Sequence, residues 1–124
     1  MCLASAFLKE KSAKIVLLDE PTSQIDQQTQ KKVLQNLFQT YKNQTVLMIA
    51  HRLETAVAFA DKILVLDAGE LVEFDHPLRL LVNNIEEVGQ GVTNKESLFG
   101  QMVGALSRTQ QEKIVRKARK RYNQ

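Results

Sequence analysis

Cysteine is nearly absent from this sequence, and its scarcity bears on the redox compartment in which the chain works. The one cysteine, Cys2, cannot form an internal disulfide. The first residues also lack the charged start and cleavage pattern of a secretory signal. Together these absences make a reducing, cytosolic setting the default expectation.

Long apolar runs are absent as well, which excludes a membrane-spanning helix in this sequence. The longest runs, such as Ile15 to Leu18 and Val46 to Ala50, fall far below the roughly 20 residues needed to cross a bilayer. With 44% hydrophobic and 25% charged residues in 124 residues, the composition excludes a disordered or fibrous class. One globular domain with one core is expected.

The charges are distributed unevenly along the chain. From Ser107 onward, seven Lys or Arg face the single acid Glu112, which gives this segment a net charge of +6. Because the whole chain carries +3, residues 1–106 carry −3. We therefore predict a mildly acidic domain over residues 1–106 and a basic C-terminal tail over residues 107–124, either a last helix or disordered.

The first half of the chain predicts an α/β arrangement. Residues 3–13 have the spacing of a short amphipathic helix, and "KIVLLDE" has no polar alternation, as in a strand buried on both faces. From Asp26, apolar residues recur at helical spacing, and "QTVLMIAH" is a second apolar strand. Strand, helix and strand at this spacing predict a βαβ unit in a parallel sheet.

The second half predicts shorter elements. "RLETAVAFA" has the pattern of a helix, and residues 61–75 that of two strands joined at Ala68-Gly69, with the glycine supplying the turn. Pro77 suits the first turn of the next helix, with His76 as a turn residue or cap. A loop over residues 86–95 and a core helix in "ESLFGQMVGAL" complete the pattern.

Two adjacent carboxylates, Asp19 and Glu20, end the first apolar run. Ligands bind at the carboxyl ends of strands in parallel sheets, because loops and helix starts gather there. One carboxylate suits Mg²⁺ as a hard oxygen ligand, and a second can accept a proton from an attacking water. The pair fits phosphoryl transfer, although two acids can also simply close a strand and start a turn.

The longer string resembles the ATP-binding cassette (ABC) family. "LLDEPTS", then Asp26, then a strand ending in "AHR", looks like that family's Walker B strand, D-loop and switch-histidine region, in order. "DKILVLDAGELVEFDHP" is similar to the following strand pair, and "NKESLFGQMV" to the end of the cassette in the C subfamily, the multidrug-resistance-protein-like exporters. The resemblance covers roughly residues 1–106 and implies an incomplete P-loop NTPase (RecA-like) sheet, the C-terminal half of an ABC ATPase domain.

The resemblance implies a role for each matching residue. Asp19 would hold the Mg²⁺ of Mg-ATP through water, and Glu20 would be the general base. Ser23 and Asp26 would form the D-loop that reaches a partner cassette, and His51 would contact the γ-phosphate.

Simpler alternatives stand beside two of these roles, and the D-loop is atypical. Asp26 lies where a helix begins and could serve as an N-cap. His51 follows an apolar strand and could be a buried histidine. Gln24 and Ile25 depart from the residues usual in the D-loop.

Several of the family's motifs are missing. None of the five glycines is followed by Lys and then Ser or Thr, so the phosphate-binding loop is absent, as are the glutamine loop and the signature. We expect these motifs upstream in a parent protein. Without the phosphate-loop strand, the sheet should expose an apolar seam, and the isolated chain should neither bind nor hydrolyse ATP.

The resemblance implies part of the ATPase motor of an exporter, with ATP and Mg²⁺ as cofactors. Its partners would be a second nucleotide-binding domain and the transmembrane domains of the same transporter, at the cytoplasmic face of a membrane, with no nucleic acid. Two alternatives remain open at this point. The basic tail suits a soluble ABC ATPase acting on nucleic acid or ribosomes, and the missing motifs suit a non-enzymatic remnant.

Overall fold

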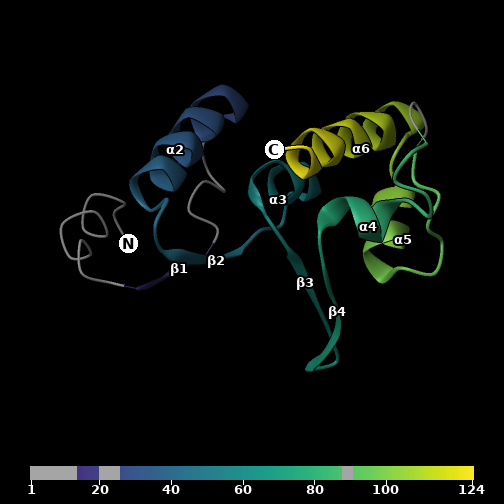
Figure 1. Cartoon of the computed structure of the whole chain (residues 1–124), viewed down its shortest axis with the longest axis horizontal. Coiled ribbons are helices and arrows are strands. Elements are labelled where there is room, and N and C mark those ends of the chain that lie inside the picture. Colours follow the sequence, from purple (N-terminus) through teal and green to yellow (C-terminus); the bar gives the residue numbers. More distant parts are fainter. Residues whose placement is uncertain (1–13, 20–25, 88–90) are drawn as a thin grey trace. The chain divides into compact units, whose positions relative to one another are not determined.

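The computed structural model describes residues 14–19, 26–87 and 91–124 (Figure 1). The predicted helix over residues 3–13 lies outside them. The chain forms two compact units, one up to His51 and one from Arg52 onward. The predicted mixed α/β class is confirmed, because the described strands form one parallel and one antiparallel pair.

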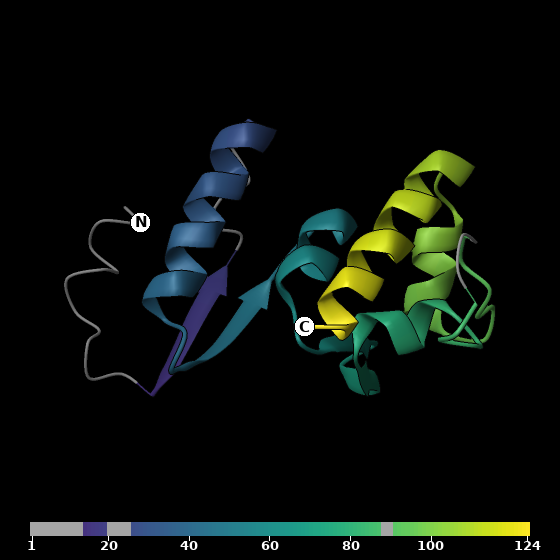
Figure 2. The same ribbon diagram turned by 45° about the horizontal axis from the view of Figure 1, so that its top comes forward.

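The first unit is the predicted βαβ arrangement. Strand β1 (Ile15–Asp19) leads to helix α2 (Gln27–Thr40) and then to strand β2 (Thr45–Ile49). The two strands are parallel, and Asp19 lies opposite Ile49 in the register. Figure 2 shows both strand arrows pointing the same way, with α2 returning alongside them.

The core of the first unit lies between α2 and one face of the parallel pair. Its cluster of buried residues consists of Val16 and Leu18 of β1, Leu37 of α2, and Tyr41, the C-cap residue directly after α2. The prediction that β1 is buried on both faces is wrong, because α2 covers one face and Leu17 is 69% exposed on the other. The exposed face carries four large apolar side chains, Ile15, Leu17, Leu47 and Ile49.

The second unit combines a β-hairpin with four helices. The hairpin strands are β3 (Ile63–Asp67) and β4 (Glu70–Asp75), and the helices are α3 (Leu53–Phe59), α4 (Pro77–Leu81), α5 (Leu98–Gly104) and α6 (Arg108–Tyr122). The turn at Ala68-Gly69 is confirmed, and both residues have positive φ, 47° and 79°. A two-residue hairpin turn of this kind needs positive φ at both positions, which Gly69 adopts without strain.

The core of the second unit is the larger one. Among the described residues it draws on every element of the unit except β4, with Val57, Leu78, Leu81, Val103 and Ala118 fully buried. Helix α6 packs against α3, α4 and α5 (Figure 1). The basic segment after residue 106 therefore forms the helix that was one of its two predicted states, and that helix contributes to the core.

The hairpin leaves one apolar face uncovered. Opposed residues of an antiparallel pair share a face, and the pairs Leu64–Phe74 and Leu66–Leu71 lie on the outer one. Together with Val72, these side chains are 43–64% exposed. Both units thus present an exposed apolar sheet face.

Candidate functional site

Asp19 occupies the position predicted for a cation ligand. It is the last residue of β1, and its side chain is exposed rather than packed into the core. Two parallel strands have their carboxyl ends at the same edge of the sheet. Asp19 pairs with Ile49, the last residue of β2, so both strands end level with each other at this edge. Glu20 and Ser23 follow immediately and lie outside the described residues.

His51 lies at the same edge. It comes two residues after the end of β2, and its side chain is exposed. The alternative of a buried structural histidine is therefore wrong. An exposed imidazole at the strand end can donate or accept a hydrogen bond toward a ligand held at this edge.

Asp26 serves as the N-cap of α2, as one of its two predicted roles requires. Its Oδ1 accepts from the backbone N–H groups of Gln28 and Thr29 at 3.1 and 3.0 Å, and its Oδ2 accepts from the Thr29 hydroxyl at 2.7 Å. These hydrogen bonds, that of the Thr29 backbone N–H first, hold the pKa of Asp26 below its ordinary value. Capping does not exclude the D-loop role, and that role stays a prediction.

The chemistry of this edge fits Mg²⁺ bound together with a phosphate-bearing ligand. Within residues 14–19, 26–87 and 91–124, no cluster of three or more His, Cys, Asp or Glu could hold a metal by itself. Mg²⁺ keeps several waters and is commonly bound through one or two carboxylates plus substrate phosphates. A single exposed carboxylate at Asp19 meets the protein's part of that requirement.

The cations of α6 are largely engaged within the second unit. Lys113 and Lys117 both pair with Glu54 of α3, Lys113 at 3.2 Å. Their hydrogen bonds, that of Lys117 first, hold the pKa of Glu54 below its ordinary value. Arg121 pairs with Asp61 at 2.5 Å.

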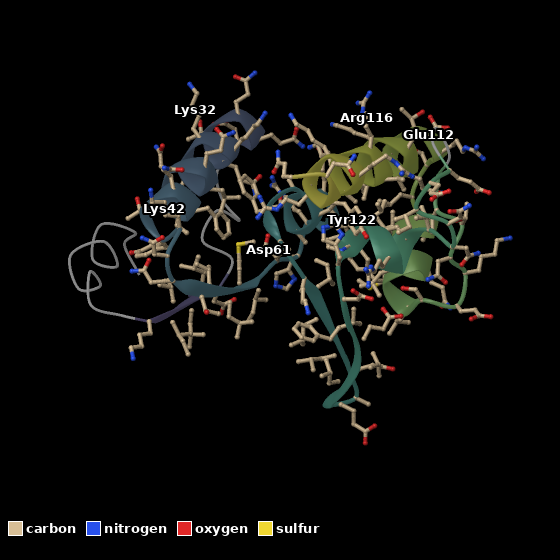
Figure 3. The ribbon with its side chains drawn as sticks, viewed as in Figure 1. Lys32, Lys42, Asp61, Glu112, Arg116 and Tyr122 are labelled. Atoms are coloured by element: carbon tan, nitrogen blue, oxygen red, sulfur yellow. The ribbon has the colours of Figure 1, made fainter. Side chains whose placement is uncertain are left out.

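Two further cations of α6 also have partners within the second unit. Arg119 donates to the carbonyl oxygens of Ile85 and Glu87, and Arg108 pairs with Glu112 at 3.0 Å. Five of the seven cations after Ser107 therefore hold α6 to its own unit or to itself. In Figure 3, Arg116 and Glu112 project from the outer side of α6.

Two carboxylates that organise the second unit were missed by the reasoning from sequence. Glu54 pairs with residues about sixty positions away, and Glu73 accepts from the backbone of α5. No local pattern marks either residue, because the fold supplies the partners. By contrast, the cap of α6 had a signal: Ser107 and Gln110 form a capping box, which the string "SRTQ" encodes.

No helix within the described part of the chain has both the length and the hydropathy to cross a bilayer. No family model matches the sequence.

Several curated proteins are similar in sequence to this chain. The chain is 50% identical over 82 residues to a pleiotropic ABC efflux transporter of multiple drugs from Candida glabrata, which covers 66% of this chain and 5% of that protein. It is 47% identical over 83 residues to an ATP-dependent bile acid permease from Saccharomyces cerevisiae, with coverage of 67% and 5%.

A third relative matches nearly the whole chain. ATP-binding cassette sub-family C member 4 from Homo sapiens is 36% identical over 122 residues, which is 98% of this chain and 8% of that protein. The chain thus spans less than a tenth of the length of these relatives. By its sequence, the chain belongs to the C subfamily of ATP-binding cassette transporters.

Proposed function

We propose that the chain is the C-terminal half of a nucleotide-binding domain in an ABC exporter. The observation that carries this proposal is the shared edge of β1 and β2, where Asp19 and His51 are both exposed. By name, one relative that matches this chain is an ABC efflux transporter and another is a permease. Mg-ATP would bind at this edge, and its hydrolysis would drive transport through transmembrane domains elsewhere in the parent protein.

Each residue has a defined task in this proposal. Asp19 holds the hydrated Mg²⁺, which neutralises charge on the phosphates when bound. Glu20 accepts the proton of the attacking water. His51 hydrogen-bonds the γ-phosphate and responds to its loss. Ser23 and Asp26 present the D-loop to a second nucleotide-binding domain, and the capping hydrogen bonds to α2 hold Asp26 in place.

The uncovered apolar faces support the same proposal. Exposed contiguous apolar patches mark surfaces that are covered in the working assembly. The face of Ile15, Leu17, Leu47 and Ile49 and the outer face of the hairpin would pack against the remainder of the nucleotide-binding domain. Five of the seven tail cations contact their own unit or their own helix, which favours this proposal over one in which the tail binds nucleic acid.

A chimera with the human relative tests this function. Because the two sequences align over 98% of this chain, the chain can replace the matching segment of sub-family C member 4. We expect ATP hydrolysis to persist in the chimera and to fall by about 100-fold or more with Glu20→Gln, since general-base catalysis is worth roughly that much. Glu112→Gln, on the exposed outer side of α6, is the matched control.

Two results would contradict the proposal. One is a chimera that folds and hydrolyses ATP equally well with Glu20→Gln, and the other is a folded chimera with no hydrolysis. For the isolated chain we expect no useful affinity for Mg-ATP, because a phosphate-binding loop is missing from its sequence. Isothermal titration that showed micromolar binding to the isolated chain would contradict this second expectation.

A further inference from the structure

His76 stands at the start of α4 and completes its first turn. Its Nδ1 accepts the backbone N–H of Leu78 at 3.1 Å, and its own backbone N–H donates to Asp75 Oδ1 at 2.7 Å. A ring nitrogen that accepts a hydrogen bond carries no proton, so the imidazole is in its neutral form with the proton on Nε2. The cap therefore exists only while His76 is neutral.

The same ring contacts the end of α6. The rings of His76 and Tyr122 meet edge to face, with centroids 4.9 Å apart and planes at 79°. The Arg79 guanidinium lies over the Tyr122 ring, 6.0 Å from its centroid, and a hydrogen bond with Tyr122 raises the pKa of Arg79. Figure 3 shows Tyr122 at the C-terminal end of α6. His76 thus belongs both to the cap of α4 and to the docking site of the last turn of α6.

Charged groups face His76 from every element around it. Burial is the largest influence and lowers the pKa of His76, while nearby charges act in both directions. Asp75 at the end of β4 and Asp61 ahead of β3 raise it, and Arg121 of α6 and Arg79 of α4 lower it. The net result is a pKa below the ordinary value of 6.5.

We propose that His76 is a pH-sensitive latch between α4 and the last turn of α6. Protonation converts Nδ1 from an acceptor into a donor that faces the Leu78 N–H. It also places a positive charge beside the Tyr122 ring, where the Arg79 guanidinium, which already lies over that ring, repels it. Leu78 and Leu81 of α4 are fully buried, whereas Tyr122 is 36% exposed. The last turn of α6 is therefore the part that separates.

The direction of the pH dependence follows from the lowered pKa. The unfolded chain takes up the proton at about the ordinary pKa of histidine, and the folded chain takes it up only at lower pH. The latch is therefore fully stabilising above the unfolded value of 6.5. This stabilisation is lost as the pH falls from there through the folded-state pKa.

Nuclear magnetic resonance on the whole chain tests the latch. Between about pH 8 and about pH 5, we expect the Tyr122 ring resonances to shift with the same midpoint as His76. The exchange protection of the Leu78 amide should fall about fivefold, the typical effect of losing one N-cap. Tyr41, in the first unit, is the internal reference, and its ring resonances should not follow the His76 midpoint.

His76→Asn is the decisive variant, because Asn caps a helix without titrating. We expect both pH responses to disappear in it. His76→Asp, which remains an acceptor down to its own lower pKa, replaces it should the Asn variant not fold. A Tyr122 response that persists in either variant would overturn the latch. An unchanged Leu78 protection in the wild type through the His76 midpoint would also overturn it.

Discussion

The two units of the chain differ in the size of the core that their described residues form. In the described part of the first unit, helix α2 covers one face of two parallel strands, and four buried residues form the core cluster. In the second unit four helices accompany the hairpin, and twelve described residues are buried together. The exposed candidate site residues Asp19 and His51 belong to the first unit, and most of the buried apolar surface to the second.

This difference separates the parts that carry chemistry from the parts that carry stability. In the described part of the first unit only four residues are buried together, which is little apolar surface to offset the entropy of ordering the chain. The second unit adds long-range ties to a larger core: the Glu54 and Asp61 ion pairs, and the Glu73 cap. We infer that the first unit depends on the rest of a nucleotide-binding domain, and the second much less.

Separate expression of the two units gives the largest expected effect. We expect residues 52–124 to fold cooperatively and residues 1–51 to remain largely unfolded, since small domains need a closed core. Circular dichroism and thermal unfolding of the two fragments make the measurement. A cooperative transition in residues 1–51 alone would remove the contrast between the units.

Within the second unit, Leu81→Ala should cost roughly 2–5 kcal/mol in the free energy of unfolding. Leu81 is fully buried between helices, and its removal leaves a cavity. Leu66→Ala is the matched control, because Leu66 is 64% exposed on the outer face of the hairpin. Its cost should stay within about 0.5 kcal/mol. Urea unfolding compares the two, and similar losses would mean that the hairpin face is covered in the isolated chain.

Two glycines of α5 provide a sharper comparison of packing. A Cβ at Gly100 would lie 2.3 Å from the Asn94 carbonyl oxygen and 3.0 Å from that of Leu80. Because these are backbone atoms, Gly100→Ala should cost about 1–3 kcal/mol. A Cβ at Gly104 meets nothing within 4 Å, so Gly104→Ala should stabilise the helix by up to about 1 kcal/mol. Thermal unfolding that moved both variants in the same direction would contradict this packing.

Local patterns predicted the elements of the described residues and several of their ends correctly. The Asp26 and His76 caps and the Ala68-Gly69 turn each depend on neighbours within a few residues, and the core helix of "ESLFGQMVGAL" on helical spacing. The exposed face of β1 was missed, because an unbroken apolar run is the same whether a strand is covered on both faces in this chain or only in a larger assembly.

Part of the candidate site could also be predicted from local patterns. Two strand ends at βαβ spacing predicted Asp19 and His51 at one edge, and the register pairs Asp19 with Ile49, two residues before His51. Glu20 and Ser23 lie outside the described residues, and their roles stay predictions. Glu54 and Glu73 could not be predicted, since their partners are far along the chain and only the folded backbone brings them together.

Glu73→Ala tests this last kind of residue and should cost less than Leu81→Ala. Glu73 accepts from the Leu98 and Phe99 N–H groups at 2.7 and 3.0 Å and from the Ser97 hydroxyl at 3.2 Å. Its loss leaves two helix-start N–H groups without this acceptor, which should cost about 1–2 kcal/mol. Glu70→Ala, exposed on the same strand, should change the urea midpoint little. Equal effects of the two variants, with unchanged amide exchange at Leu98, would show that α5 does not need its distant cap.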